Sequence, residues 1–395
     1  MHYQNITTEG QLREFCRDLP RHEAIAFDTE FVSEHTYQPV LCLIQVAAGQ
    51  QLAVIDAMAM DDLSPFWEAI AEPGHETIVH AGRGEVEFSL QTIGRRPAGL
   101  FDVQIAAGLA GMEYPAAYSK LIGKLLGTPT QKHETRTDWR RRPLSQRQIE
   151  YALDDVRHLG PLRDNLHATL KRLGRLDWLA EEMDSWQDEV QRSFTQERWR
   201  RVSGNSGLDR RSLAIVRELW RWREAEAQRR NKPVRRVLRD DLIVELARRR
   251  SADPKRIRAV RGLERGDLRR RLDEIAAAIR RGLELPEADC PQAIRRERSP
   301  QYSVLGQFLF SALGSICRRS QLAPSLVGTP SDIRELIAFR TTAVAEGSGS
   351  RKVPKLATGW RAEFVGRLFD DLLAGKRAVR IEDPTSNHPL VIEPR

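Results

Sequence analysis

Two acids lie two positions apart in the apolar run AIAFDTEF, where Asp28 and Glu30 follow small and aromatic residues. Alternate residues of a β-strand point to the same side, so both carboxylates belong to one face of the expected strand. Acids paired at the end of a buried strand repel each other and lose hydration, and a cation between them offsets both penalties. Mg²⁺ and Mn²⁺ prefer carboxylate oxygens, so the pair suggests a divalent-metal site. An exposed strand end with two unrelated acids is the simpler explanation of an isolated pair.

Further candidate groups occur later in the chain. Tyr151 and Asp155 are four residues apart in a helical pattern, which places them on one face of a helix. Glu85 follows the short apolar run TIVHA, at the expected start of the next helix. Each has a structural alternative: a half-buried tyrosine beside an exposed acid, and an acid that only complements the helix dipole.

The elements that must position these groups read as mixed α/β. Strands are expected at 24–31, 40–48, 52–56 and 77–81. The short Gly49-Gln50 step between the second and third strands predicts a hairpin turn. Three strands in succession, followed by helix and strand in alternation, predict a mixed sheet flanked by helices.

From about residue 119 the pattern becomes helical. Residues 183–207 are polar and charged and suggest a connector, 286–300 suggest a linker, and a short polar tail ends the chain. The stretch EGSGSRKVP, at 346–354, suggests a mobile loop. We therefore expect an α/β domain at 1–190, and all-α helical bundles at 207–285 and 300–376.

Several ordered motifs together resemble the DEDDy family of 3′→5′ exonucleases, and within it ribonuclease D. The first is D-T-E-F, which contains the acid pair. The others are H-A-G-x-x-x-x-E at His80–Glu87, D-V-Q at Asp102–Gln104, R-T-D-W at Arg136–Trp139, R-P-L at Arg142–Leu144 and Y-x-x-x-D at Tyr151–Asp155. The resemblance implies a ribonuclease H-like fold for the α/β domain.

The resemblance also implies roles for the acids. Asp28, Glu30 and Asp155 would hold one divalent ion, and Asp28 with Glu85, partly through water, would hold a second. Two such ions, Mg²⁺ or Mn²⁺, clamp the attacking and leaving oxygens of a phosphodiester displacement. The Tyr151 hydroxyl would orient the attacking water, and the products would be nucleoside 5′-monophosphates.

The sequence departs from the family pattern at one ligand position. Glu85 stands where the family has an aspartate, which keeps the charge but adds one methylene. Catalytic groups need positioning within about 0.5 Å, so the change could shift the second ion, alter metal preference or slow turnover. Restoring aspartate is expected to raise the rate or relax the metal preference. Glu87 and Asp102 are nearby acids to which the resemblance gives no metal role.

The charge balance favours a polyanionic partner. The net charge is +8 and the isoelectric point is about 9.5, with arginine dense from Arg210 onward. Such chains bind nucleic acid through counterion release, although a charged run is often only a solvated face. Arg136 and the run Arg140–Arg142 precede the tyrosine helix and either contact phosphates or form a solvated basic loop.

The helical bundle at 208–285 resembles the HRDC module, which commonly binds nucleic acid. The resemblance rests on Leu219–Ala227, Asn231–Pro233, Val237–Ile243, Val260–Leu263 and Arg280–Gly282. Trp220 and Trp222 either stack on bases or pack in the bundle core. Residues 301–374, with P-K-L-x-T-G-W-R, resemble a more divergent second module. Two modules beside the α/β domain would form a basic channel to the metals.

Other protein classes fit less well. No apolar run approaches the roughly 18 residues of a membrane span, and the N-terminus lacks the apolar core of a signal peptide. Four scattered cysteines form no C-x-x-C pair, which argues against a zinc site or disulfide framework. We expect a cytoplasmic protein without a membrane partner, taken as a monomer.

The resulting hypothesis is a 3′→5′ exoribonuclease that trims the 3′ ends of tRNA precursors and other structured RNAs. A DNA 3′→5′ exonuclease uses the same acids and stays as an alternative. A nucleic-acid-binding protein with a nuclease site impaired at Glu85 is the rival from another class.

Overall fold

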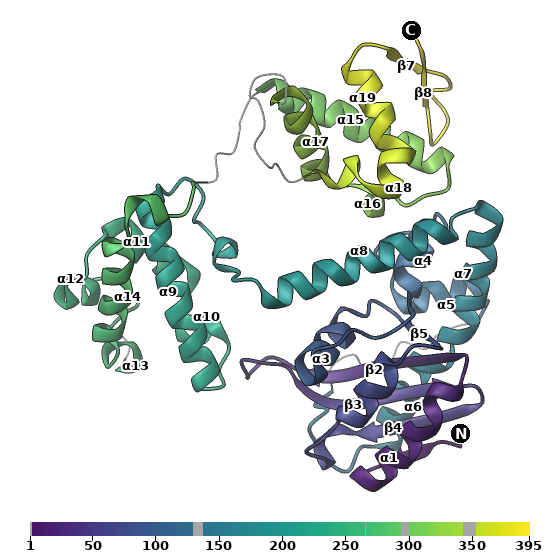
Figure 1. Cartoon of the computed structure of the whole chain (residues 1–395), viewed down its shortest axis with the longest axis horizontal. Coiled ribbons are helices and arrows are strands. Elements are labelled where there is room, and N and C mark those ends of the chain that lie inside the picture. The colour runs from purple at the N-terminus through teal and green to yellow at the C-terminus, as the bar shows by residue number, and fades with distance from the viewer. Residues whose placement is uncertain (1, 129–136, 265, 294–299, 343–352) are drawn as a thin grey trace.

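The computed structural model describes residues 2–128, 137–264, 266–293, 300–342 and 353–395. A six-stranded mixed sheet forms the first part, in the order β1-β4-β3-β2-β5-β6 (Figure 1). Its strands are β1 (Gln4–Ile6), β2 (Ala24–Val32), β3 (Val40–Ala48), β4 (Gln51–Asp56), β5 (Glu76–Val79) and β6 (Leu100–Asp102). The expected α/β fold with a mixed sheet is confirmed.

Strand β2 lies in the middle of the sheet, and its two neighbouring strands pair with different lengths of it. It pairs antiparallel with β3 along its whole length, whereas β5 pairs with it only at Ala24–Ala26. The second half of β2, with Asp28 and Glu30, therefore extends past the end of β5. The turn at Gly49-Gln50 joins β3 to β4 as expected, with Gly49 at a φ of 57°.

Helices cover both faces of the sheet, because β2 is apolar on both sides. Ile25 and Phe27 pack towards α1 (Glu9–Asp18), α2 (Ser64–Ala71) and α3 (Arg83–Ile93). Ala26 faces the opposite layer. That layer contains α4 (Val103–Leu109), α5 (Tyr118–Leu125), α6 (Gln146–Arg157) and α7 (Leu159–Leu173).

A long helix replaces much of the expected connector. Residues 183–207 were expected to link domains, but α8 (Leu176–Thr195) continues through the first half of them (Figure 1). Met183 and Val190 are buried at helical spacing, and Trp186 packs beside them. The many charged residues occupy the other faces of the helix, which explains why this stretch reads as a polar connector.

The helices after α8 form a separate bundle, here called the central helical unit. It comprises α9 (Arg210–Arg229), α10 (Val234–Val237), α11 (Asp240–Arg249), α12 (Pro254–Arg258), α13 (Gly266–Arg269) and α14 (Leu272–Glu284). It has its own apolar core. Trp220 and Trp222 both pack against that core, and the Trp222 Nε1–H donates to Glu274 at 3.0 Å. Both tryptophans therefore belong to the packing of the bundle.

The C-terminal unit is helical but ends in strands. It comprises α15 (Pro300–Arg319), α16 (Pro324–Val327), α17 (Pro330–Thr342), α18 (Gly359–Arg361), a π-helical turn (Ala362–Gly366) and α19 (Arg367–Leu373). The expected polar tail is instead a hairpin of β7 (Arg377–Ile381) and β8 (Leu390–Pro394). Leu390 packs on the core, and its amide donates to Ser315 Oγ at 3.0 Å. Most of the stretch at 346–354 lies outside the described residues.

The C-terminal unit shares one continuous core with the α/β part. Leu309, Leu336 and Phe369 belong to the same buried cluster as Leu162 and Ile105. A buried ion pair crosses the boundary, because the Arg361 Nη2 group donates to Glu182 Oε1 at 2.8 Å. The buried Arg175 side chain adds bonds at 2.6 Å to the carbonyls of Leu109 and Gln321.

Replacing Glu182 with alanine is expected to destabilise the protein by about 3–5 kcal/mol, because it leaves the Arg361 guanidinium buried without its carboxylate. Chemical denaturation would measure the change in the free energy of unfolding. Glu382→Ala is the matched control, since its ion pair with Arg319 is about half exposed and should contribute little. Equal stability of the two variants would contradict a structural role for the buried pair.

Among the helices within the described ranges, none has the length and apolar character needed to cross a bilayer.

Candidate active site

Three carboxylates from two elements converge at the uncovered part of β2. Asp28 and Glu30 on β2 and Asp155 on α6 each offer an oxygen, and these oxygens all lie within 4.8 Å of one another. The structure thus brings together three of the four acids that the sequence singled out. A divalent ion is the group that such a cluster of hard oxygen ligands suits best.

Helix α6 is fixed on the sheet by a capped end and an apolar base. Its cap is Ser145, whose hydroxyl accepts the Gln148 amide at 3.3 Å while the Gln148 side chain accepts the Ser145 amide at 3.0 Å. Ala152 and Leu153 are buried against β3 and β4, on the side of the helix turned to the sheet. These contacts hold Asp155 against β2.

The electrostatics of the cluster indicate a site that needs a cation. Burial, reinforced by the charge of Asp155, raises the pKa of Asp28 to about 7. Burial and the charge of Asp28 raise the pKa of Glu30 to about 9. Burial also raises the pKa of Asp155 to about 7. Without a cation the carboxylates favour their protonated forms, so these residues fit a divalent metal.

Stability and metal affinity should consequently depend on pH in opposite directions. Because these acids have a higher pKa in the folded state than in the unfolded state, their protonation stabilises the metal-free fold at low pH. That stabilisation is lost as the pH rises from about 4, the ordinary pKa of a carboxyl group, past the raised values of about 7 and about 9. A metal binds the ionised groups, so the increase in melting temperature caused by Mg²⁺ should be larger at pH 9 than at pH 6. Thermal melts with and without the metal at each pH would measure it. An increase independent of pH would contradict the metal assignment.

Glu85 lies beside the three-acid cluster but is not a member of it. It is buried at the start of α3, where Thr29 Oγ1 donates to its Oε1 at 2.6 Å. Burial and the charge of Asp28 raise its pKa to about 8. The fourth expected acid is therefore within electrostatic range of Asp28, and its longer side chain is held by Thr29.

Tyr151 contacts the cluster through Asp155. Its hydroxyl donates a hydrogen bond to the Asp155 carboxylate, and the centroid of its ring lies 6.1 Å from the centroid of the Trp139 ring. Burial and the charge of Asp155 raise the pKa of the Tyr151 hydroxyl well above its usual range. In the metal-free protein the group therefore stays protonated at neutral pH and donates its hydrogen bond to Asp155.

Two residues that orient the acids were not identified from the sequence. Gln45 lies directly opposite Asp28 on β3, and its Nε2 donates to Asp28 Oδ2 at 3.0 Å. The second is Thr29, described above. A polar residue within the apolar run VLCLIQVAA was an available signal for Gln45, whereas the contact between Thr29 and Glu85 depends on how α3 meets β2.

The two other nearby acids have structural roles. Asp102 accepts the amides of Gly82 at 2.9 Å and Gln104 at 2.8 Å, and so fixes the loop before α3. Glu87 pairs with Arg83 at 3.0 Å. Both carboxylates are engaged by these groups, so neither compensates for the change at position 85.

The arginines before α6 differ in their hydrogen-bond partners and in their exposure to solvent. Arg142 donates to Asp56 and, at 2.9 Å, to the carbonyl of Cys42, so it belongs to the fold and is not available to substrate. Arg140 pairs with Asp138 at 2.9 Å, whereas the Arg141 side chain is 86% exposed. Arg136 lies outside the described residues. Of the three arginines that the structure describes, Arg141 is the most exposed, and its Nε lies 4.0 Å from Asp138 Oδ2.

Comparison with known proteins assigns both regions. Residues 3–171 match the family model described as 3'-5' exonuclease, and residues 212–279 match the HRDC domain. The first match contains all five candidate site residues. The second lies within the central helical unit.

Relatives cover nearly the whole chain. Ribonuclease D of Acidiphilium cryptum is 36% identical, with 95% of this chain and 94% of the relative covered. Ribonuclease D of Granulibacter bethesdensis is 35% identical, with 92% and 90% covered. The crystal structure of Escherichia coli RNase D, described as an exoribonuclease involved in structured RNA processing, matches with a TM-score of 0.83 and 28% identity. It covers 95% of this chain and 99% of that chain.

The similarity extends through the exonuclease region, the HRDC domain and the C-terminal unit, because the matched structure covers nearly all of the chain. Enzymes with this exonuclease domain depend on divalent metal, and the three-acid cluster described above suits that requirement. The chain belongs to the ribonuclease D family and is a 3′→5′ exoribonuclease.

Proposed function

We propose that this exoribonuclease trims the 3′ ends of tRNA precursors and other structured RNAs, releasing nucleoside 5′-monophosphates. The observation that carries the proposal is the cluster of Asp28, Glu30 and Asp155 on the exonuclease fold. The description of the Escherichia coli relative as a processor of structured RNA supports the substrate class.

The proposed site holds two ions, Mg²⁺ or Mn²⁺. Asp28, Glu30 and Asp155 would hold one, and Asp28 with Glu85 would hold the other. When bound, such ions supply a nucleophile at neutral pH and stabilise the charge that develops in an in-line displacement. Gln45 and Thr29 would keep the acids oriented, because each donates a hydrogen bond to one of them.

Tyr151 orients the attacking water in this proposal. Its hydroxyl is anchored near the cluster by Asp155, and its ring is packed against Trp139. Its single proton is donated to Asp155, so the phenol oxygen would accept a hydrogen bond from the attacking water and set the orientation of that water. Its contribution is therefore orientation, and Tyr151→Phe would lose the hydroxyl while keeping the ring.

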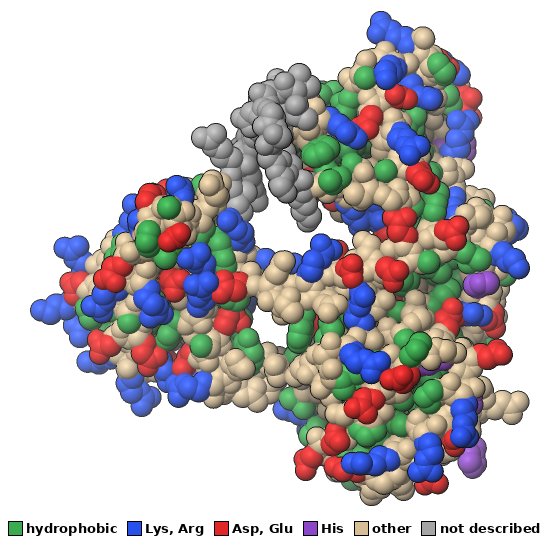
Figure 2. All heavy atoms as spheres, viewed as in Figure 1, with side chains coloured by type: hydrophobic (Ala, Val, Ile, Leu, Met, Phe, Trp, Pro, Cys, Tyr) green, Lys and Arg blue, Asp and Glu red, His purple; other side chains and the backbone are tan. Residues whose placement is uncertain are grey.

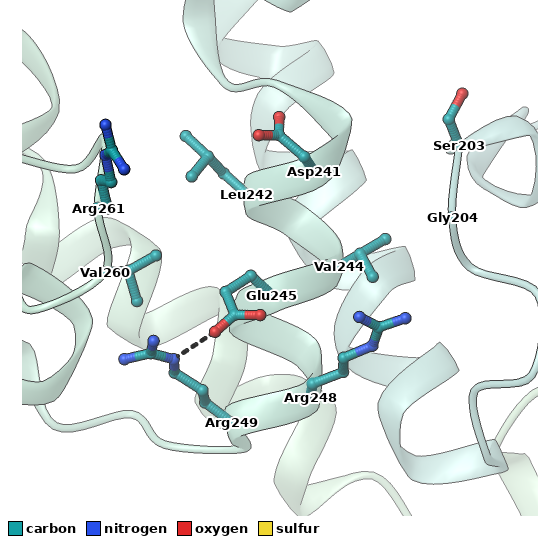
Figure 3. Close-up of a pocket in the computed structure, with 10 residues that line it drawn as sticks. All are labelled: Ser203, Gly204, Asp241, Leu242, Val244, Glu245, Arg248, Arg249, Val260 and Arg261. Atoms are coloured by element: carbon teal, nitrogen blue, oxygen red, sulfur yellow. Dashed lines mark hydrogen bonds and ion pairs between the residues drawn. The ribbon is translucent and has the colours of Figure 1, made fainter.

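The central helical unit is the proposed RNA-binding platform. Figure 2 shows it as a separate lobe rich in basic side chains, with an opening between it and the exonuclease part. One pocket of about 600 Å³ on this lobe contains Arg248, Arg249 and Arg261 (Figure 3). Arg249 pairs with Glu245 at 2.7 Å, and no described residue forms an ion pair with either of the other two arginines.

Replacing Arg248 and Arg261 together with alanine should weaken RNA binding and make it less sensitive to salt. Each lost phosphate contact should reduce the slope of log K against log[salt] by about 0.7 on single strands. Titration of labelled RNA at several salt concentrations would measure the slope. Arg249→Ala is the local control and should have a smaller effect, because Glu245 already neutralises its charge. Equal salt slopes for the double variant and for Arg249→Ala would contradict this view of the pocket.

Several finer expectations belong to the same proposal. The C-terminal unit would be a divergent second HRDC-like module at 300–376, beside domains at 1–190 and 207–285. The protein would act as a monomer in the cytoplasm. Arg141 would contact the RNA backbone near the site.

A time course on 5′-labelled RNA and DNA of matched sequence tests the function. Stepwise shortening of a 3′-extended tRNA with Mg²⁺ or Mn²⁺, and none in EDTA, is the expected result. Faster digestion of DNA would favour the deoxyribonuclease, and binding without shortening would favour an impaired nuclease. Undiminished digestion in excess EDTA would contradict the metal site.

A further inference from the structure

Asp102 is a buried carboxylate that has no place among the proposed metal ligands. It is 1% exposed and ends β6, where it lies opposite Val79, the last residue of β5. These two parallel strands therefore end at the same edge of the sheet, and the chain passes there from β5 into α3. Burying a carboxylate is costly unless hydrogen-bond donors satisfy it, so the donors around Asp102 indicate its role.

Both oxygens of Asp102 accept backbone amides at the beginnings of two helices. Oδ1 accepts the Ala81 amide at 3.1 Å and the Gln104 amide at 2.8 Å, and Oδ2 accepts the Gly82 amide at 2.9 Å. Gln104 lies in the first turn of α4, whose N-cap is Asp102 itself. Gly82 is the N-cap of α3 and has no side chain that could cap it. Asp102 therefore supplies from β6 the acceptor that the loop before α3 lacks.

The loop that Asp102 holds has an unusual backbone. Ala81 has a φ of 55°, in the left-handed region that residues other than glycine seldom adopt. The Ala81 side chain is exposed, so its packing does not impose this conformation. The amides of Ala81 and Gly82, on either side of the strained residue, are the two that Asp102 accepts. These hydrogen bonds consequently stabilise the left-handed conformation.

Glu85 depends on how this loop starts α3. It lies three residues after Gly82, in the first turn of the helix. Thr29 holds the end of its side chain at 2.6 Å, but the direction in which the side chain leaves the backbone is set by the beginning of α3. Groups in such sites need positioning within about 0.5 Å, so a small rotation of the loop would displace the Glu85 carboxylate from Asp28.

We propose that Asp102 is a positioning residue that holds Ala81 in its left-handed conformation and so directs Glu85 towards the second ion. The proposal rests on the two-ion site proposed above. In this role Asp102 touches neither the RNA nor a metal and acts through Glu85 alone. Substitutions of Asp102 or Ala81 should therefore lose their effect once position 85 no longer binds an ion.

Asp102→Asn keeps the shape of the side chain but replaces one accepting oxygen with an NH2 group, which cannot accept an amide. We expect kcat to fall about 10- to 100-fold with little change in KM, and one of two calorimetric Mn²⁺ binding events to weaken by a similar factor. In a Glu85→Gln background the same substitution should change kcat less than about twofold. Asp62→Asn is the matched control, because Asp62 accepts the Ser64 amide at 2.9 Å just before α2.

The exposed position of Ala81 permits a second test that leaves Asp102 intact. Valine strongly disfavours a positive φ, whereas asparagine tolerates it. Ala81→Val should therefore reproduce the loss of kcat seen in Asp102→Asn, and Ala81→Asn should lose much less. Ala81→Gly combined with Asp102→Asn should recover part of the lost rate, because glycine adopts the left-handed conformation without steric cost. Thermal melts would establish that each variant is folded.

Equal factors of loss for Asp102→Asn in the wild-type and Glu85→Gln backgrounds would overturn the positioning role, because a purely structural defect acts independently of position 85. Equal rates for Ala81→Val and Ala81→Asn would overturn it as well. In both cases the two-ion site stands as long as Glu85→Gln is itself slow. A near wild-type rate for Glu85→Gln would refute the second ion, so the two failures are distinguishable.

Discussion

Asp155→Asn is expected to lower kcat by at least about a thousandfold while the protein still folds and binds RNA. Asp155 supplies the only oxygen of the three-acid cluster that comes from α6. An amide removes the charge that holds the cation, and metal ions contribute several kcal/mol to the transition state. Each 1.36 kcal/mol corresponds to about a tenfold change in rate. Single-turnover digestion of 3′-extended tRNA in Mg²⁺ would measure the loss.

The metal-free protein supplies a second readout for this variant. The charge of Asp155 contributes to the raised pKa of both Asp28 and Glu30, so its removal relieves repulsion. Asp155→Asn should therefore melt at a higher temperature than wild type in EDTA and gain less from added metal. Asp154→Asn is the control, because its carboxylate pairs with Arg157 at 3.1 Å and is not in the cluster. A near wild-type rate for Asp155→Asn would remove this residue from the site.

Glu85→Gln is expected to lower kcat by at least about a hundredfold, the next largest effect. Glutamine keeps the length of the side chain and can still accept the Thr29 hydroxyl, so only the charge is lost. If Glu85 and Asp28 hold a second ion, that ion loses a ligand worth several kcal/mol. Calorimetric titration of Mn²⁺ should then change from two binding events to one. A near wild-type rate would mean that three acids and one ion suffice.

Thr29→Val separates the charge of Glu85 from its orientation. It keeps the carboxylate and removes the 2.6 Å hydrogen bond, and loss of such an orienting group typically costs about 10- to 100-fold in metal affinity or activity. Aspartate is one methylene shorter, so in a Glu85→Asp background Thr29→Val should have little further effect. Equal effects in both backgrounds would assign Thr29 a purely structural role.

The meander β2–β4 was predictable because it is local. The expected ranges 24–31, 40–48 and 52–56 differ from the observed strands by at most one residue at each end. Apolar runs define these strands, and a two-residue turn joins the last two. Strand β1 was missed, because it has three residues and pairs with β4 across a long stretch of chain.

The other errors came from polar residues on regular elements. Helix α8 combines buried and charged positions, whereas the β7–β8 hairpin combines partly buried apolar residues with charged ones. The charge of both elements led to predictions of a connector and a tail. Composition reports the exposed faces of such elements, and the buried faces become evident only once the core they contact is known.

For the candidate site, the sequence predicted which acids meet but not which residues orient them. Acid spacing together with ordered motifs correctly anticipated that Asp28, Glu30 and Asp155 would meet, because strand and helix periodicities place them. The precise partners were not predictable. The contact between Thr29 and Glu85, and the engagement of Arg142 by Asp56 and the Cys42 carbonyl, depend on packing angles between distant segments.

The core shared by the α/β part and the C-terminal unit has a consequence for shortening the chain. The polypeptide leaves that core after Thr195, builds the central helical unit, and returns at Pro300. The HRDC-containing segment is therefore an insertion within one folding unit. Replacing it by a short linker should preserve that unit, whereas ending the chain after α14 would uncover apolar side chains and leave Glu182 buried without Arg361.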